Sequence, residues 1–197
     1  VAYLMDQTHA SLPRNLRQMG LNDEEIRILP SDATHRMCPD ALAAAIKEDI
    51  GKGLKPMMVV ATAGTTNTGA ADPLEAIADI CEQHDMWLHV DGAYGAPAAI
   101  TQTGRDVLKG LERADSVVLD PHKWFFQPYD LGMCFVTRPG ALDRCFSMDP
   151  EYLKDVQADN EVNYGNRSLE LTRRSRALKL WMSLRTYGAA SFRAGVA

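Results

Sequence analysis

An acid and an amine stand at the ends of two short apolar segments of this sequence. Asp91 closes the segment at residues 87–90, and Lys123 follows the segment at 116–119 through residues 120–122. Because ligands of open α/β sheets bind beyond the carboxyl ends of the strands, both side chains are predicted to converge on one crevice. A lysine amine forms a Schiff base with an aldehyde, and a carboxylate keeps a pyridine nitrogen protonated. These are the two anchors that pyridoxal phosphate requires.

The elements expected to position these residues follow from an alternation of short apolar runs with helical patterns, which is typical of βα units around a largely parallel sheet. Strands are predicted at residues 1–5, 26–29, 57–61, 87–90 and 116–119, with an antiparallel partner at 132–136. Helices are predicted at residues 11–19, from 39 to 51 or 53, at 74–84 and at about 171–187, with 92–111 helical or irregular. The expected fold class is α/β.

Individual residues support these bounds. Pro39 suits the first turn of a helix, and Asp72 with Pro73 forms an N-cap and first-turn pair. Met57 and Met58 are predicted to be buried residues of the third strand.

One loop has the glycine spacing of a nucleotide-binding P-loop. Residues 64–71 follow a predicted strand and precede a predicted helix, but Ala70 and Ala71 stand where a P-loop needs Lys and Ser or Thr. The sequence therefore disfavours a nucleoside triphosphatase. No metal site is predicted either, because no HExxH or comparable ligand spacing occurs among His9, His35, His84, His89 and His122.

Composition narrows the class of protein further. The 197 residues are 46% hydrophobic with a formal net charge of −5, which indicates a globular chain and disfavours a nucleic-acid surface. Residues 173–176 form the only dense basic cluster and are expected at a helix start, as a solvated face or as partners of an anion or acid. Free thiols are expected because no CxxC spacing links Cys38, Cys81, Cys134 and Cys145.

The sequence also lacks membrane signals. No uninterrupted apolar stretch approaches the roughly 20 residues that span a bilayer, and residues 1–6 do not have the charged leader of a signal peptide. A cytoplasmic protein without membrane or nucleic-acid partners is expected.

Several ordered motifs resemble one family. Residues 91–94 and 120–124 are similar to the cofactor segments of the group II pyridoxal-phosphate-dependent amino acid decarboxylases, which include aromatic-L-amino-acid decarboxylase. Further motifs follow the family's order at residues 6–11, 61–66, 87–91 and 149–154. The resemblance implies the large domain of a fold-type I pyridoxal-phosphate enzyme that works as a homodimer.

Site residues can be carried over from this resemblance one by one. Lys123 would hold the cofactor as a Schiff base, and Asp91 would pair with its pyridinium nitrogen. His9 matches a histidine that stacks on one ring face, and Ala93 matches a small residue packed on the other. Thr66 matches a threonine that lines the cofactor site.

Three more positions bear on phosphate binding and on the reaction. His122 is expected near the phosphate and the reacting centre. Asp120 replaces an asparagine of the animal enzymes, and an ionised aspartate cannot donate a hydrogen bond to phosphate. Tyr152 matches a loop tyrosine that protonates the former α-carbon after decarboxylation, where relatives with phenylalanine tend toward oxygen-dependent aldehyde formation. The resemblance thus implies simple decarboxylation to an amine and CO2.

Other polar and aromatic residues have structural interpretations. His89 points opposite to Val90 within a strand and is interpreted as a structural histidine. Trp124, Phe125 and Phe126 are interpreted as core and interface packing rather than as a substrate pocket.

The resemblance divides the chain into three parts. Residues 1–150 match the later part of the cofactor-binding domain, 151–170 a mobile catalytic loop, and 171–197 a helix leading into an incomplete small domain. Family members carry a Ser/Gly-rich phosphate turn upstream of the position that matches Val1, so an excerpt or a truncated relative is expected.

Alternatives to an aromatic amino acid decarboxylase remain open. One is a non-catalytic remnant or interaction module that holds the phosphate poorly. Another is a different fold-type I enzyme, either an aminotransferase or a carbon–carbon lyase, which Tyr152 disfavours. Glutamate, diaminobutyrate and other amino acids remain open as substrates, because the motifs bind the cofactor and not the substrate side chain.

Overall fold

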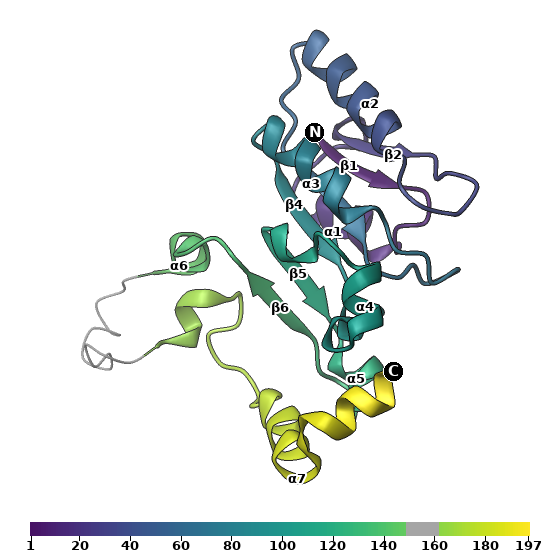
Figure 1. The fold of residues 1–197 in the computed structure, drawn as a ribbon. Helices are drawn as coiled ribbons and strands as arrows, with labels where there is room; N and C mark the ends of the chain where they lie inside the picture. The colour runs from purple at the N-terminus through teal and green to yellow at the C-terminus, as the bar shows by residue number, and fades with distance from the viewer. Residues whose placement is uncertain (149–161) are drawn as a thin grey trace.

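The computed structural model describes residues 1–148 and 162–197, and its centre is a six-stranded sheet in the order β2-β1-β3-β4-β5-β6 (Figure 1). The strands are β1 (Ala2–Met5), β2 (Ile26–Leu29), β3 (Met58–Thr62), β4 (Trp87–Asp91), β5 (Ser116–Leu119) and β6 (Met133–Val136). The first five are parallel, and β6 pairs antiparallel with β5. The α/β class and all six strands are confirmed.

The strand order changes direction beside β1. The chain passes from β1 to β2 on one side and then returns to place β3 on the other side of β1. Such a switch point opens a crevice at the carboxyl ends of the two strands. Residues that follow β1, β3, β4 and β5 therefore emerge at the same edge of the sheet.

Strand alternation divides the sheet into two different faces. Helices α2 (Pro39–Gly51) and α3 (Leu74–Gln83) cover the face that carries the larger core, where Leu42, Ile46 and Ile77 are fully buried. Each such side chain contributes about 1.5–3 kcal/mol on burial. On the other face, α1 (Ser11–Gln18) buries Leu16 against a smaller cluster around β1.

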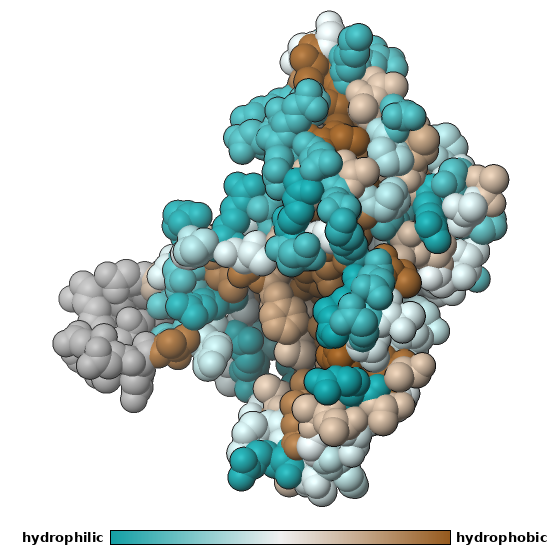
Figure 2. Space-filling view, viewed as in Figure 1, coloured by the Kyte–Doolittle hydropathy of each residue, from teal (hydrophilic) through white to brown (hydrophobic). Residues whose placement is uncertain are grey.

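The remaining described helices are short, apart from the last. They are η1 (Asp23–Glu25), η2 (Ala96–Ile100), α4 (Gln102–Val107), η3 (Leu111–Arg113), α5 (Pro121–Trp124), α6 (Ala141–Phe146), η5 (Tyr164–Arg167) and α7 (Ala177–Val196). Figure 2 shows hydrophilic surface over α3, whereas apolar surface gathers over β5 and β6, where Phe135 is 47% exposed.

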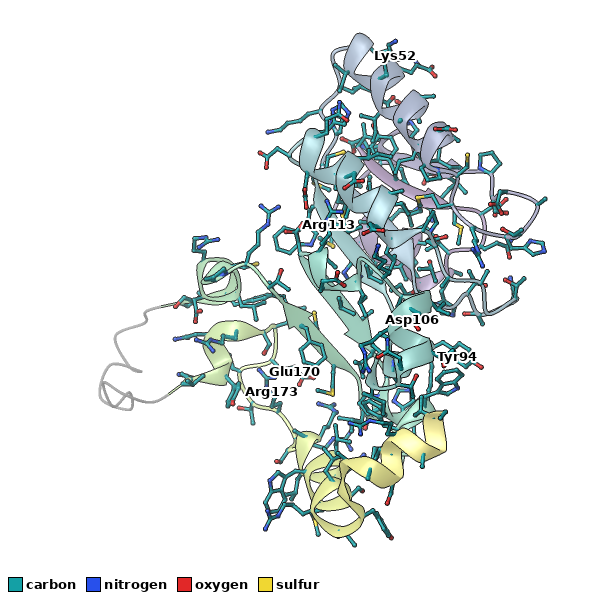
Figure 3. All side chains as sticks on the ribbon, viewed as in Figure 1. Lys52, Tyr94, Asp106, Arg113, Glu170 and Arg173 are labelled. Carbon is teal, nitrogen blue, oxygen red and sulfur yellow. The ribbon has the colours of Figure 1, made fainter. Side chains whose placement is uncertain are left out.

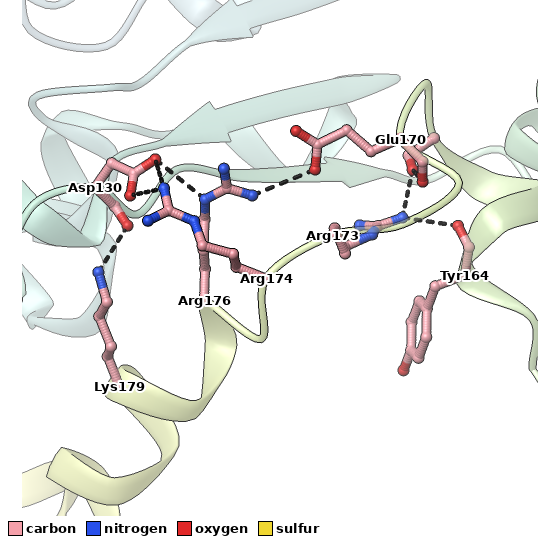
Figure 4. A network of polar contacts seen from close by, with 8 residues as sticks. Asp130, Tyr164, Glu170, Arg173, Arg174, Arg176 and Lys179 are labelled. Carbon is pink, nitrogen blue, oxygen red and sulfur yellow. Dashed lines mark hydrogen bonds and ion pairs between the residues drawn. The ribbon is translucent and has the colours of Figure 1, made fainter.

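The last helix differs from its predicted bounds of 171–187. It begins at Ala177, because Arg174 and Arg176 turn toward Asp130 instead of starting a helix (Figure 4). Arginines in a first helical turn would also oppose the helix dipole. The predicted end is half right, because Gly188 has φ 76° and kinks the helix, which then resumes to Val196.

Three local predictions are wrong. Met57 is 43% exposed and precedes β3, so only Met58 belongs to the strand. Phe126 has φ 55° and is 62% exposed, so the predicted core packing is wrong for this residue, while its predicted interface packing stays a prediction. Asp72 does not cap α3, since its carboxylate accepts hydrogen bonds from the backbone N–H groups of Met37 and Thr62, both at 2.7 Å.

Candidate functional site

A cavity of about 510 Å³ lies at the carboxyl ends of the parallel strands. It is lined by six of the eight predicted site residues, namely His9, Thr66, Asp91, Ala93, Asp120 and Lys123. His122 is not among the lining residues, and Tyr152 lies outside the described residues. Residues separated by more than a hundred positions in the chain thus meet at one edge of the sheet.

Asp91 is placed by a tight turn at the end of β4. Gly95 approaches β3 so closely that a Cβ atom there would lie 2.3 Å from the carbonyl oxygen of Ala63. The turn directs the Ala93 N–H to Asp91 Oδ1 at 3.1 Å. Asp91 is 7% exposed, and its carboxylate has no ion pair among residues 1–148 and 162–197. This buried carboxylate faces the cavity with little compensation for its charge.

Lys123 is placed by the short helix α5 after β5. Its Nζ lies 3.0 Å from Asp120 Oδ2, and the Lys123 side chain is 42% exposed. Asp120 Oδ2 also lies 3.6 Å from His122 Nε2. His122 Nδ1 accepts a hydrogen bond from the Leu131 N–H at 3.0 Å, which assigns the proton of the neutral ring to Nε2. Asp120 is therefore directed at Lys123 and His122.

His9 and Thr66 lie on two exposed loops on either side of the switch point. His9 Nδ1 is 2.8 Å from the hydroxyl of Ser11, the first residue of α1. The Asn67 side chain donates to Gln7 Oε1 at 3.3 Å and so connects the loop of Thr66 to that of His9. Both side chains are thus placed at the mouth of the cavity.

Aromatic residues border the same region. Tyr94 projects from the turn after β4 (Figure 3), and its ring centroid lies 4.8 Å from that of Trp124. Phe125 packs against the main core and against Phe192 of α7 at 6.0 Å. The core packing predicted for Phe125 is confirmed, and Trp124 packs against Tyr94.

His89 also lines the cavity. Its Nδ1 is 2.8 Å from the Ser116 hydroxyl oxygen, which accepts a hydrogen bond from Trp87 Nε1 at 2.8 Å. Burial lowers the pKa of His89, and the nearby Asp91 opposes this effect. The contact with Ser116 agrees with the structural role predicted for His89, which stays a prediction, and the interpretation missed that His89 shares a strand face with Asp91 and lines the cavity.

Thr62 is the second cavity residue that the sequence reasoning missed. It pairs in register with Asp91 across β3 and β4, so the two side chains share one face of the sheet. Side chains two residues apart in a strand share a face, so Thr62 lies on the same face as Val60, which is buried under α1. This alternation could have predicted the position of Thr62.

The chemistry of these groups fits pyridoxal phosphate. The amine of Lys123 can attach an aldehyde, and the under-compensated carboxylate of Asp91 can pair with a protonated ring nitrogen. Small Ala93 leaves room for a flat ring. The mostly parallel sheet and this site define an α/β protein of the fold-type I pyridoxal-phosphate class.

Comparisons with known proteins identify the family. The model of the pyridoxal-dependent decarboxylase conserved domain matches residues 1–197, and the chain belongs to this family. It is 46% identical to an aromatic-L-amino-acid decarboxylase of Bacillus atrophaeus over 100% of this chain and 41% of that protein. A phenylacetaldehyde synthase of a Rosa hybrid cultivar is 38% identical over 98% of this chain and 39% of that protein.

A solved structure agrees with these relatives. The crystal structure of Oryza sativa TDC with PLP and tryptamine matches with a TM-score of 0.93 and 35% identity, over 98% of this chain and 40% of that chain. The chain spans about two fifths of the length of these relatives.

Within residues 1–148 and 162–197, no helix is both long and apolar enough to cross a membrane. In the same part of the chain, no three His, Cys, Asp or Glu side chains are grouped to hold a metal ion.

Proposed function

We propose that this chain carries the cofactor site of an enzyme that decarboxylates an L-amino acid, preferably an aromatic one, to the amine and CO2. One observation carries the proposal, namely that Lys123 and Asp91 line the same cavity. Asp91 ends β4, and Lys123 follows the neighbouring strand β5. This spacing suits a ring that needs an amine at one end and an acid at the other. When bound, pyridoxal phosphate supplies an electron sink for the pair of electrons left by CO2.

Each side chain then has a role at a stated position. Lys123 Nζ would attach the cofactor covalently, and Asp91 would pair with the protonated ring nitrogen. His9 and Ala93 would flank opposite faces of the ring, and Thr66 would orient it from the loop after β3. These roles are supported by the lining of the cavity.

Two polar side chains, Asp120 and His122, lie close to the amine of Lys123. Asp120 Oδ2, at 3.0 Å, holds the ammonium of Lys123 in place, and the Nε2–H of His122 faces the same carboxylate at 3.6 Å. His122 therefore acts through Asp120 rather than on the ring. Asp120 is a partner of the amine in this proposal, not a ligand of the phosphate.

Tyr152 determines the product in this proposal. Its hydroxyl delivers a proton to the former α-carbon, which completes decarboxylation to the amine. The alternative product is an aldehyde, and a phenylacetaldehyde synthase is among the relatives. The presence of tyrosine favours the amine over this alternative and over transamination or carbon–carbon cleavage.

The finer features of the protein are proposed from the same resemblance. Residues 1–150 would form part of the cofactor-binding domain, 151–170 the catalytic loop, and 171–197 the approach to a small domain. A cytoplasmic homodimer is proposed because the motifs resemble those of a family whose members work as homodimers.

An absorbance titration with pyridoxal phosphate tests the cofactor site, performed on the natural polypeptide that carries this chain. A saturable band near the visible edge is expected, and Lys123→Ala should abolish it. Lys109→Ala is the matched control, because Lys109 forms an exposed ion pair with Glu75 at 3.0 Å outside the cavity. A band that persists in Lys123→Ala, or no band in the unaltered protein, would overturn the proposal.

Product analysis tests the reaction. The loaded protein, supplied with aromatic amino acids, should release CO2 and amine in equal amounts. Tyr152→Phe should shift the products toward aldehyde, ammonia and hydrogen peroxide, with oxygen consumed. Aldehyde and peroxide as main products of the unaltered protein from every accepted amino acid would contradict the role of Tyr152.

A further inference from the structure

A row of polar side chains runs along the sheet face that carries the cavity. Thr62 ends β3 on this face, and Asp91 ends β4 directly beside it in the parallel register. Neighbouring strands lie about 4.8 Å apart, so the two side chains are immediate neighbours. The cavity end that holds Asp91 is therefore also lined by a hydroxyl.

The Thr62 hydroxyl is buried without a hydrogen bond. Thr62 is 3% exposed, and its Oγ1 has no partner within residues 1–148 and 162–197. A buried hydroxyl without a partner costs about 1–3 kcal/mol relative to a satisfied one. A methyl group would occupy the same space at no such cost, so folding alone does not account for the hydroxyl.

The backbone of Thr62 is held from both sides by one residue. The Thr62 N–H donates to Asp72 Oδ2 at 2.7 Å, and the Asp72 N–H donates to the Thr62 carbonyl at 2.9 Å. Asp72 Oδ1 also accepts the Met37 N–H at 2.7 Å, which anchors the clamp to the loop before α2. The backbone of Thr62 in the cavity wall is thus firmly held, and only the side-chain torsion is left to set the direction of the hydroxyl.

The Asp91 carboxylate can use a further donor. Its Oδ1 accepts the Ala93 N–H, and no hydrogen bond to Oδ2 occurs among the described residues. We propose that Thr62 is a positioning residue of the cofactor site, whose hydroxyl donates to Asp91 Oδ2 and holds that carboxylate toward the protonated ring nitrogen. The inference rests on the proposed function, since it needs Asp91 to meet a cationic ring.

Thr62 then acts through Asp91 and not on the reacting atoms. A rotation about one side-chain bond brings Oγ1 toward the neighbouring strand, and threonine has staggered positions available for it. With the ring bound, the hydroxyl gains a charge-assisted hydrogen bond, which is about twice as strong as a neutral one. Binding of the cofactor thereby repays the cost of the unpartnered hydroxyl.

Two substitutions separate the hydroxyl from the shape of the side chain. Thr62→Val keeps the shape and removes the donor, whereas Thr62→Ser keeps the donor and removes a methyl group. The affinity of each for pyridoxal phosphate is measured by the Lys123-dependent absorbance band of the natural polypeptide, and Tm is measured without cofactor. Val should weaken binding about tenfold with Tm unchanged or higher. Ser should keep the affinity within about twofold and lower Tm.

A double-mutant cycle tests the route through Asp91. In an Asp91→Asn background, where the carboxylate is gone, Thr62→Val should change the affinity by less than about twofold. Equal affinity of the Val and unaltered proteins, or the same tenfold loss in both backgrounds, would overturn the inference. A band that is absent from the unaltered protein would instead contradict the cofactor site itself, so the two failures are distinguishable.

Discussion

Two buried carboxylates of this protein are surrounded very differently. Asp49 on α2 is 2% exposed and accepts hydrogen bonds from Arg27 Nη2 at 2.6 Å, from Arg27 Nε at 3.0 Å and from the Tyr3 hydroxyl at 2.9 Å. Asp91 on β4 is 7% exposed and accepts only the Ala93 N–H among the described residues. The first carboxylate is fully compensated, and the second is not.

The difference separates structure from function. Hydrogen bonds from Arg27 hold the pKa of Asp49 below its usual range despite burial. A buried charge is tolerated when it is paired and hydrogen-bonded, so Asp49 completes the fold between β1, β2 and α2. Asp91 faces a cavity instead of an arginine, which leaves its charge available to a cationic ligand.

Replacing the compensated carboxylate should have the largest effect on stability. Asp49→Ala leaves the Arg27 guanidinium and the buried Tyr3 hydroxyl without their acceptor, and the free energy of unfolding should fall by about 3 kcal/mol. Urea denaturation measures this loss. Asp79→Ala is the matched control, because Asp79 pairs with Arg113 at 2.7 Å on the surface and should cost less than about 1 kcal/mol. Equal losses in both variants would contradict the distinction.

The clamp residue Asp72 should have the next largest effect. Asp72→Asn places a donor against one of two backbone N–H groups, which should cost about 2 kcal/mol. Asp106→Asn on exposed α4 is the control and should change the free energy of unfolding by less than about 0.5 kcal/mol.

The stability supplied by Asp72 should also depend on pH. Burial raises its pKa from 3.8 to about 6, against the opposing backbone hydrogen bonds. A raised folded-state pKa means that the folded protein binds the proton more tightly, so this stability is fully present below pH 4 and is lost as pH rises through 6. The unaltered protein should therefore exceed Asp72→Asn in free energy of unfolding, measured by urea denaturation, by an amount that shrinks from pH 4 to pH 7. A difference that grows over this range would show that the hydrogen bonds from the two N–H groups to the ionised carboxylate outweigh the effect of its burial.

The two strand-end residues were predictable because parallel strands bring their carboxyl ends to one edge. That rule placed Asp91 and Lys123 together from the sequence alone, and the cavity confirms their proximity. Glycine and proline also marked helix bounds well, as at Pro39. Local sequence signals were sufficient wherever the controlling contacts are local.

Long-range contacts limited the rest. Asp72 reads as a helix cap, but its carboxylate binds the N–H of Met37, 35 residues earlier in the chain. Arg176 reads as part of a helix, but it pairs with Asp130 at 3.1 Å (Figure 4). Thr62 looks like any strand residue until its register with Asp91 is known. These partners are set by the tertiary fold and leave no local pattern.

Replacing the uncompensated carboxylate should hardly affect stability. Asp91→Ala removes a buried charge with a single hydrogen bond, so the free energy of unfolding without cofactor should change by about 1 kcal/mol or less. The same variant should bind pyridoxal phosphate at least about tenfold more weakly, whereas Asp49→Ala should bind it normally while folded. A fall of about 3 kcal/mol in the free energy of unfolding of Asp91→Ala would show that this carboxylate stabilises the fold as Asp49 does.

Asp120 should show the smallest effect of all. Its ion pair with Lys123 is partly exposed, 24% and 42% for the two side chains, so Asp120→Asn should change the free energy of unfolding by less than about 1 kcal/mol. Because Asp120 is directed at Lys123 and His122, removing its charge should affect pyridoxal phosphate and pyridoxal equally. The ratio of their affinities, measured by absorbance, should stay within about twofold of the unaltered protein. A ratio that shifts several-fold toward pyridoxal phosphate would instead show that the Asp120 charge lies beside the phosphate. Asp120 would then be, like Asp91, a carboxylate whose charge the bound ligand must compensate.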